Sequence, residues 1–353
     1  MASRTATDLD FLAANVHGRR SRLAEADRLD ELCRVRSLPE LAQRVLPGEQ
    51  VLSVEDLQRR LVLAQVHEMA FIAARLDGAS GHLLDWLCAR FQMENIKVLA
   101  RGFSRGLALD ELRLHLVPLG GGLAFEEEVL GAADSIEAFA AAVLSPPLRE
   151  GIERAIPLYR ERPRPFFVEA GLDHGYLVEL LARARRVPAA DQRDVLQIAR
   201  QEADTFHLAL VVRGKFHYGL DLETLMTFHV SGSRISQNLF QAMVRAEHLS
   251  EVASMADGVA IDASPGELTD AATLEILAWN RYLRVANWVF RRSHMGLGAV
   301  VAFEAVRRVE LANLIRLSEG IRAGLSPDDI RRRLIPRTDL SAARARSGEP
   351  LRV

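Results

Sequence analysis

The sequence predicts an all-α protein assembled from three helical repeats, and three observations support that prediction. The 353 residues are 49% hydrophobic, so the chain can bury a large core. Leu, Ala and Val are interleaved with Arg and Glu, and only 6% of residues are aromatic, which favours helices over sheets. One local pattern, a helix that ends at a glycine before a short second helix, occurs three times. Such a repeat predicts a scaffold of pseudo-threefold shape.

Each copy of the pattern begins at an anchor residue that carries an amide or an imidazole. The outer two copies share identical spacing over 24 positions, and the middle copy has one extra residue between its glycines. The first copy comprises Asn95, Arg101, Gly102, Gly106, Leu107, Asp110, Leu112, Val117 and Pro118. The middle copy comprises His207, Arg213, Gly214, Gly219, Leu220, Glu223, Leu225 and Val230. The last copy comprises Asn313, Glu319, Gly320, Gly324, Leu325, Asp328, Ile330, Ile335 and Pro336.

A helix with a tyrosine precedes the anchor helix in two of the repeats. Glu169 lies 38 positions before His207, and Tyr176 lies 31 positions before it. Glu275 and Tyr282 precede Asn313 by the same two distances. Repeat 1 is looser, and its first helix is expected at about residues 61–76. The repeat unit is therefore a helical pair.

These units predict one helical domain over residues 1–338, with repeats at about 11–150, 165–255 and 267–338. The anchor helices, at about residues 91–104, 195–216 and 300–322, should lie around one approximate threefold axis. The final segment, 339–353, is Ala-, Arg- and Ser-rich without a clear apolar face, so we expect a disordered tail.

The glycines at the junctions have a conformational reason. Gly106, Gly219 and Gly324 stand where a helix must stop, and glycine accepts the left-handed conformation of a C′ residue without steric cost. Ser326 is the expected N-cap of the last short helix, whereas Ala108 at the equivalent place makes a weaker cap. A loop is expected over residues 157–165, which begins and ends with proline.

Bulk properties exclude several classes of protein. The formal net charge of −2 gives no reason to expect a nucleic-acid partner. Two cysteines without CxxC spacing indicate reduced thiols in a cytoplasmic protein rather than a disulfide framework. The first ten residues lack a secretory signal pattern, and no apolar run approaches the roughly 20 residues that span a bilayer. We therefore expect a protein that is soluble or peripheral to a membrane.

Motifs that would indicate catalysis are absent from the sequence. There is no GxxxxGK[ST] phosphate-binding loop and no HExxH zinc motif, and Gly296 and Gly298 do not continue into a dinucleotide fingerprint. Asp204 and His207 have the i, i+3 spacing of a helical di-iron site, but such a site needs a second pair and further carboxylates. The alternative, a polar packing position, fits the alignment of His207 with two asparagines. We expect no catalytic, cofactor-binding or metal-binding residue.

Two groups of charged residues are candidates for contact with a partner. Arg101, Arg213 and Glu319 occupy one column of the repeat; they either are solvated charges near helix C-termini or face a partner surface. The densest basic run comprises Arg331, Arg332 and Arg333. This run is either solvated or contacts membrane headgroups or an acidic partner.

Several segments resemble one known family, the V/A-type rotary ATPase subunit called C in prokaryotes and d in eukaryotes. The repeated helices of that family are similar to FQMENIKVLARG, DTFHLALVVRGKFHYGL and VELANLIRLSEGIRAGL in this chain. Its first helix and the following segment resemble NVHGRRSRL and LDELCRVRSLPELAQRV. The resemblance extends from about Phe11 to Pro336. Its specificity comes from order, spacing and threefold recurrence.

The resemblance implies a fold and a role. Members of the family are all-helical funnels with pseudo-threefold symmetry. They sit on the cytoplasmic face of the membrane proteolipid ring, receive the foot of the central stalk and are present in one copy per complex. They couple ATP hydrolysis or synthesis to proton or sodium transport without being catalysts. This chain is accordingly expected to be such a rotor subunit, peripheral and without a bilayer span.

The residues leave two other functions open. The first is a helical-repeat adaptor that binds proteins and is unrelated to ion transport. Against it, the period of about 106 to 113 residues exceeds the roughly 33 to 47 residues of common solenoid repeats. The second is an all-helical enzyme with a buried metal or carboxylate site, which would need acidic pairs on facing helices.

Overall fold

The computed structural model describes residues 5–262 and 270–335, and within these ranges it contains helices and no β-strand. The N-terminal part comprises α1 (Thr5–Arg20), α2 (Ala26–Cys33) and α3 (Leu38–Val45). Repeat 1 comprises α4 (Val54–Ala73), α5 (Gly78–Arg105) and α6 (Leu109–Arg113). The link that follows comprises the 3₁₀-helix η1 (Gly121–Leu123), α7 (Glu127–Gly131), α8 (Ile136–Ala142) and α9 (Pro146–Glu161). The all-α prediction is confirmed.

Repeats 2 and 3 follow the same order of elements. Repeat 2 comprises α10 (Pro165–Ala184), α11 (Ala189–Ala209), the π-helix η2 (Leu210–His217) and α12 (Leu222–Met226). A link of α13 (Gln237–Arg245) and α14 (Leu249–Ala256) leads to repeat 3. Repeat 3 comprises α15 (Ala271–Ser293), α16 (Leu297–Arg322) and α17 (Pro327–Arg331). The expected tail, 339–353, lies outside the described residues.

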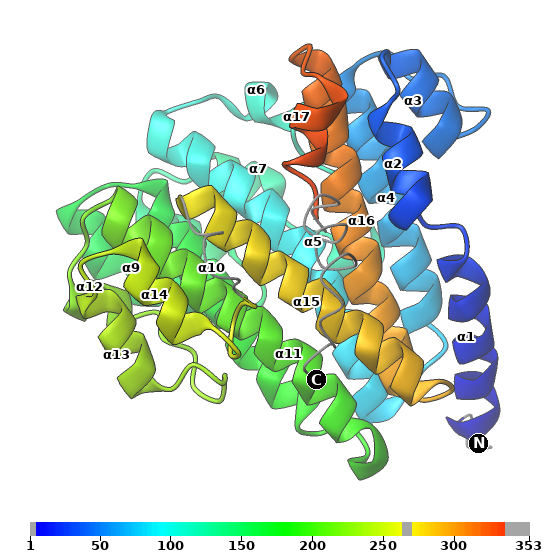
Figure 1. The fold of residues 1–353 in the computed structure, drawn as a ribbon. Coiled ribbons are helices and arrows are strands. Elements are labelled where there is room, and N and C mark those ends of the chain that lie inside the picture. The colour runs from blue at the N-terminus through cyan, green and yellow to red at the C-terminus, as the bar shows by residue number, and fades with distance from the viewer. Residues whose placement is uncertain (1–4, 263–269, 336–353) are drawn as a thin grey trace.

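Six long helices form a closed cycle of contacts. Helix α4 packs on α5, α5 on α10, α10 on α11, α11 on α15, α15 on α16, and α16 packs again on α4. Helices α11 and α16 also pack on each other across the cycle. In Figure 1, α16 lies between α4 and α15, and α12 to α14 lie on the side of the molecule opposite α1. The cycle joins the three repeats into one body, while the threefold axis and the funnel shape stay predictions.

The anchor residues close each repeat by binding the backbone beyond its short helix. Asn95 Nδ2 donates to the Val117 carbonyl at 2.7 Å, and the Val117 N–H donates to Asn95 Oδ1 at 3.0 Å. Asn313 makes the same two hydrogen bonds with Ile335. In repeat 2 the anchor is an imidazole, whose Nε2 accepts from the Val230 N–H at 2.9 Å and whose Nδ1 lies 3.3 Å from Ser233 Oγ. The predicted packing role of the anchors is confirmed.

The glycine stops adopt the predicted left-handed conformation. Gly106, Gly219 and Gly324 have φ of 66°, 65° and 65°. At the end of α5, the Leu107 N–H donates to the Gly102 carbonyl at 3.0 Å and the Gly106 N–H to the Phe103 carbonyl at 3.2 Å, the two bonds of a Schellman ending. The end of α16 repeats both bonds.

The extra residue of repeat 2 is absorbed by the π-helix η2. The hydrogen bond that closes this helix, from the Leu220 N–H to the Gly214 carbonyl at 2.9 Å, spans one residue more than the bond from Leu107 to Gly102 at the end of α5. A π-turn takes in one residue more than an α-turn, so Gly219 still reaches the C′ position. The insertion therefore changes the winding of the helix and leaves the junction intact.

A second glycine in each repeat lets the short helix approach the anchor helix. A Cβ atom built at any of these glycines would lie under 3.0 Å from the side chain of the short helix. The three pairs are Gly102 with Leu112, Gly214 with Leu225, and Gly320 with Ile330. The short helices thus sit at the same place in all three repeats.

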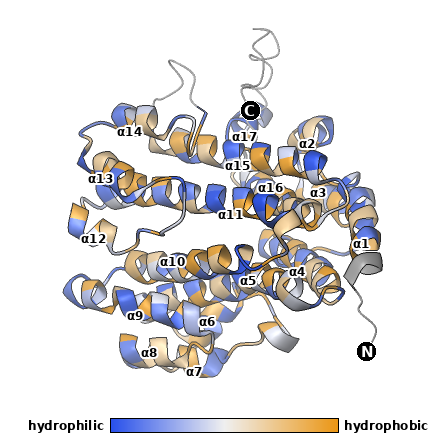
Figure 2. Cartoon of the chain, turned by 90° about the horizontal axis from the view of Figure 1, so that it is seen from below, coloured by the Kyte–Doolittle hydropathy of each residue, from blue (hydrophilic) through white to orange (hydrophobic). Residues whose placement is uncertain are grey.

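The hydrophobic core has two parts. The larger part runs through all three repeats, and the smaller joins α2, α3 and α4 to α16 and α17. Figure 2 shows hydrophobic and hydrophilic residues alternating around the same helices, as expected of helices that bury one face. The N-terminal part therefore packs on repeat 3, at the other end of the sequence. None of the described helices combines the length and the apolar character that crossing a bilayer needs.

The expected loop over residues 157–165 is wrong in its first half. Helix α9 continues through Pro157 to Glu161. Proline removes one helical hydrogen bond, to the carbonyl of Glu153, but both residues are exposed and water can take the place of the missing donor. The helix is also held by its extensive contact with α10. Tertiary packing here outweighs a local breaker.

Candidate functional site

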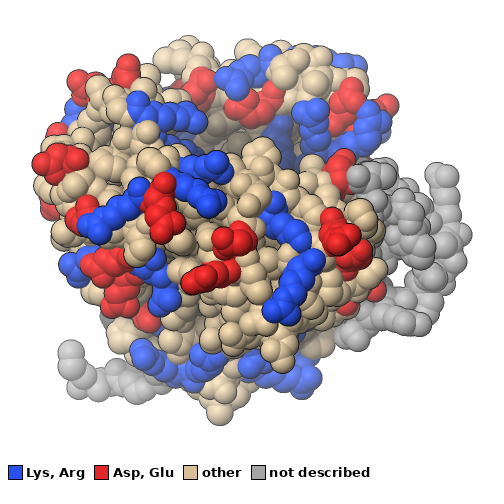
Figure 3. All heavy atoms as spheres, turned by 90° about the vertical axis from the view of Figure 1, so that its left-hand side faces the viewer, with Lys and Arg blue, Asp and Glu red and all other residues tan. Residues whose placement is uncertain are grey.

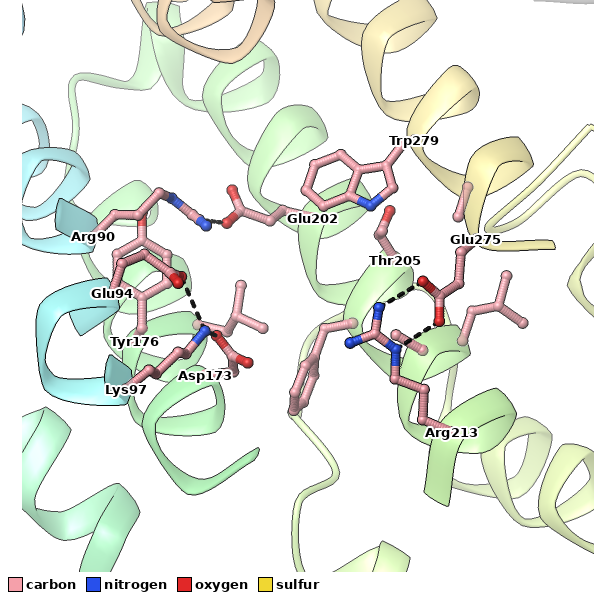
Figure 4. Close-up of a pocket in the computed structure, with 15 residues that line it drawn as sticks. Arg90, Glu94, Lys97, Asp173, Tyr176, Glu202, Thr205, Arg213, Glu275 and Trp279 are labelled. Atoms are coloured by element: carbon pink, nitrogen blue, oxygen red, sulfur yellow. Dashed lines mark hydrogen bonds and ion pairs between the residues drawn. The ribbon is translucent and has the colours of Figure 1, made fainter. Parts of the chain in front are cut away.

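A cavity of about 200 Å³ lies among helices of the three repeats. Its walls come from α5, α10, α11, η2 and α15, and Figure 4 shows the side chains that line it. We call it the inter-repeat cavity. Its charged lining residues are Arg90, Glu94, Lys97, Asp173, Glu202, Arg213 and Glu275. Apolar groups such as Leu177 and Trp279 separate these charges.

One wall of the cavity is an ionic ladder between α5 and α10. Lys97 Nζ lies 2.6 Å from Asp173 Oδ1 and 3.0 Å from Glu94 Oε1. Burial acts to lower the pKa of Lys97, but the charges of Asp173 and Glu94 outweigh it and raise the pKa above its usual value. One helical turn further along α5, Arg101 Nε lies 2.6 Å from Glu169 Oε1. The ladder ties repeat 1 to repeat 2.

Another part of the cavity lining is a two-point ion pair between repeats 2 and 3. The guanidinium of Arg213 makes two hydrogen bonds of 2.6 Å to the two carboxylate oxygens of Glu275. These bonds raise the pKa of Arg213, so the residue stays charged. Figure 4 shows both bonds. The opposite wall, with Lys97 and Asp173, is visible in the same view.

The column of Arg101, Arg213 and Glu319 thus has a role inside the chain. Arg101 binds the first helix of repeat 2 and Arg213 the first helix of repeat 3. Glu319 completes the series on the first helix of repeat 1, where Gln58 Nε2 donates to its Oε1 at 2.8 Å. The side chains of all three keep at least 40% of their surface exposed, so contact with a partner stays a prediction.

The basic run lies at α17, apart from the residues that line the inter-repeat cavity. Arg331 lies 2.8 Å from Asp328 and 3.5 Å from Asp30, so it joins α17 to α2. Arg332 pairs with Asp329, and Arg333 is exposed. On the face seen in Figure 3, Lys and Arg are mixed with Asp and Glu. Contact of the basic run with a partner stays a prediction.

Asp204 and His207 hold a loop rather than forming a pair of metal ligands. Asp204 Oδ1 accepts from the backbone N–H groups of Arg234 and Ile235 at 2.8 and 2.9 Å, and its Oδ2 lies 2.8 Å from Arg234 Nε. Both nitrogens of His207 have partners in the same region. Burial lowers the pKa of His207 well below its usual value, so the ring is neutral and accepts the Val230 N–H.

Sequence reasoning missed most of the cavity lining. Lys97 and Asp173 are each four residues from a residue that the repeat did single out, namely Arg101 and Glu169. That spacing puts both on the same helix faces as the known pair, which was the available signal. The arrangement as a whole pairs charges between helices of different repeats, with apolar groups beside them.

Comparison with known proteins identifies the family. Residues 12–333 match the ATP synthase (C/AC39) subunit family. The chain is also similar to the subunit called C of the A-type ATP synthase from Methanosphaera stadtmanae, with 23% identity over 316 residues, 86% of this chain and 79% of that protein. The match spans the N-terminal helices, all three repeats and the cavity between them. The chain therefore belongs to the ATP synthase (C/AC39) subunit family.

Proposed function

We propose that this chain is a non-catalytic rotor subunit of a V/A-type rotary ATPase. It links the central stalk to the membrane proteolipid ring and so couples ATP hydrolysis or synthesis to proton or sodium transport. The observation that carries the proposal is the family match over residues 12–333, which includes every long helix of the contact cycle. In this role the chain sits peripherally on the cytoplasmic side of the membrane, in one copy per complex.

The packing supports a mechanical role. A subunit that transmits torque must resist shear between its parts, and close-packed interiors have low compressibility. The three repeats are joined by the closed helix cycle, by the ladder at Lys97 and by the ion pair at Arg213. Arg213 and Glu275 are joined by two hydrogen bonds, which restrict the relative rotation of their helices as well as the distance between them.

The inter-repeat cavity supports a contact with the central stalk. Its lining includes the side chain of Arg213, which is 59% exposed and so within reach of a partner, together with apolar groups such as Leu177 and Trp279. Contacts with the ring are served by broad shape complementarity, because three unequal repeats meet many identical ring subunits. Arg101, Arg213, Glu319, Arg331, Arg332 and Arg333 are our candidates for these contacts.

The test is a pull-down of the tagged chain from detergent-solubilised native membranes, with quantitative mass spectrometry. We expect a proteolipid, stalk subunits and P-loop ATPase subunits, with this chain at one copy per complex. A chain tagged at the other terminus is the control against masking of an interface. Recovery of unrelated soluble partners alone would support the protein-binding adaptor and refute the rotor role.

A further inference from the structure

Three largely buried charges occupy one equivalent position in the three repeats. In each repeat the residue five positions before the anchor is ionic, although its sign differs. The positions are Arg90 before Asn95, Glu202 before His207, and Arg308 before Asn313. Their side chains are 15%, 7% and 10% exposed. We call these three residues the ionic triad.

Glu202 is the centre of the ionic triad. Its Oε1 accepts from Arg308 Nη1 at 2.9 Å and forms an ion pair with Arg90 Nη2. Figure 4 shows the ion pair with Arg90 at the end of the inter-repeat cavity away from Arg213. One carboxylate on α11 therefore binds one arginine on α5 and another on α16. These are the anchor helices of all three repeats.

Aromatic rings hold both arginines in place. The guanidinium of Arg90 lies 4.5 Å from the ring centre of Tyr176, and that of Arg308 lies 4.6 Å from the ring centre of Tyr282. These two tyrosines are themselves equivalent in repeats 2 and 3. Trp86 stacks on Tyr176 at 5.6 Å and donates its Nε1–H to the Tyr176 carbonyl at 2.9 Å. The side chains of the triad are thus confined in direction as well as in position.

A buried ionic triad contributes little to the stability of the folded state, but it fixes the relative orientation of the helices that carry it. Replacing a buried ionic triad by apolar groups of similar volume is often neutral or stabilising, because desolvation offsets the attraction. Separating the charges is strongly destabilising, because each is then left buried without a partner. A rotation or a slide of one anchor helix would separate them. The triad therefore penalises relative motion of the repeats far more than it stabilises the folded state.

We propose that Glu202 is the positioning residue that holds the three anchor helices in one relative orientation, through its bonds to Arg90 and Arg308. Loss of the triad leaves a folded protein whose repeats rock against one another. The consequence for torque rests on the proposed rotor function, since a loose coupling would absorb stalk rotation. The positioning itself concerns this chain alone.

The decisive variant removes the three charges of the ionic triad and that of Glu304, with side chains of similar volume. It combines Arg90→Met, Glu202→Leu and Arg308→Met with Glu304→Gln, because Glu304 Oε2 is buried nearby without a hydrogen-bond partner. We expect its melting temperature to equal or exceed that of the wild type. Glu202→Gln is the second variant; it leaves two arginines facing a neutral amide and should lower the melting temperature.

Relative motion of the repeats is read by pulsed electron paramagnetic resonance. Cysteines for spin labels are introduced in pairs at exposed positions ten residues after the anchors, which are Arg105→Cys, His217→Cys and Ala323→Cys. The native Cys33 and Cys88 are buried. We expect inter-repeat distance distributions about twofold broader in both triad variants, because cores lose uniqueness before they lose stability. Distributions as narrow as in the wild type, in either variant, would overturn the proposal.

A control variant tests whether the broadening is specific to the triad, and a transport measurement tests its consequence for torque separately from the proposed function. Glu137→Gln breaks the exposed pair of Arg160 and Glu137, 2.6 Å apart, and should leave the distributions unchanged; equal broadening there would overturn the assignment to the triad. In the assembled complex, the four-residue variant should transport fewer ions per ATP hydrolysed. Full coupling with broadened distances would refute the torque consequence. Absence of the wild-type chain from any ATPase complex would instead refute the rotor function.

Discussion

Helices α9 and α10 approach so closely that single methyl groups should force them apart. A Cβ atom built at Gly171 would lie well under 3.0 Å from the backbone carbonyl of Gly151, and one built at Gly151 would meet the carbonyl of Gly171 equally closely. One turn further on, a Cβ at Gly175 would meet the carbonyl of Pro147. A backbone carbonyl cannot rotate away as a side chain can, so Gly171→Ala requires the helix axes to separate.

The expected cost follows from two opposing contributions. Overpacking a tight core costs about 1–3 kcal/mol. We expect the upper half of that range, because the new methyl group meets a backbone carbonyl that cannot rotate away. Alanine also gains roughly 0.5–1 kcal/mol over glycine inside a helix. We therefore expect Gly171→Ala to lose about 1–2 kcal/mol net. In a chain of 353 residues, whose entropy of unfolding is roughly 0.7 kcal/mol/K, that lowers the melting temperature by roughly 1–3 °C.

Differential scanning calorimetry compares Gly171→Ala with a control at an unobstructed helical glycine. Gly18 lies in α1 with no atom within 4 Å of a built Cβ, so Gly18→Ala should be neutral or stabilising by up to about 1 kcal/mol. The signature of close approach is the difference in sign between the two substitutions. Stabilisation by both would mean that α9 and α10 do not make backbone contact at this point, and the reasoning would be refuted.

Three further outcomes are expected. Gly324→Val should destabilise the chain by about 1–2 kcal/mol, because a β-branched residue disfavours φ of 65°; an unchanged thermal melt would contradict the C-cap assignment. Asn313→Ala should destabilise by about 2–4 kcal/mol in a urea titration, since it leaves the N–H and the carbonyl of Ile335 buried without a partner; a loss well under 1 kcal/mol would contradict the anchor role. Burial, with a smaller effect of Arg154, lowers the pKa of His174 to about 4. Between about pH 6.5 and pH 4, His174 is therefore protonated in the unfolded chain and neutral in the folded chain. Stability should fall by up to about 3 kcal/mol as the pH drops from 6.5 to 4. His174→Gln should reduce the slope of that part of the curve, to which the buried His207 also contributes, and urea midpoints that keep the wild-type slope would argue against His174 as a source.

The repeat junctions were predictable because each depends on residues close together in sequence. A left-handed glycine, a capping serine and an anchor 22 residues before its backbone partner all lie within one repeat. Their requirements are stereochemical and hold in any surroundings, so three aligned copies reveal them. The extra residue of repeat 2 was visible too, although its solution as a π-helix was not, because several windings can absorb one residue.

The candidate site was less predictable because charges between repeats depend on which helices become neighbours. Arg101 and Glu169 are 68 residues apart, and Arg213 and Glu275 are 62 apart. Taken along the chain, Arg101 and Arg213 are ordinary cations near helix ends. Their partners follow only from the order of packing, in which each anchor helix contacts the first helix of the next repeat.

The sequence by itself determined that the chain is helical, where its anchor helices end and that the glycine-stop pattern occurs three times, because propensity, capping and left-handed glycine act within a few residues. Only the tertiary structure decided that Pro157 stays inside a helix, that α16 returns to α4, and that Glu202 lies between Arg90 and Arg308. Those outcomes depend on burial and on contacts between distant segments. A solvated charge needs no partner, whereas a buried charge is costly unless it is paired with an opposite charge.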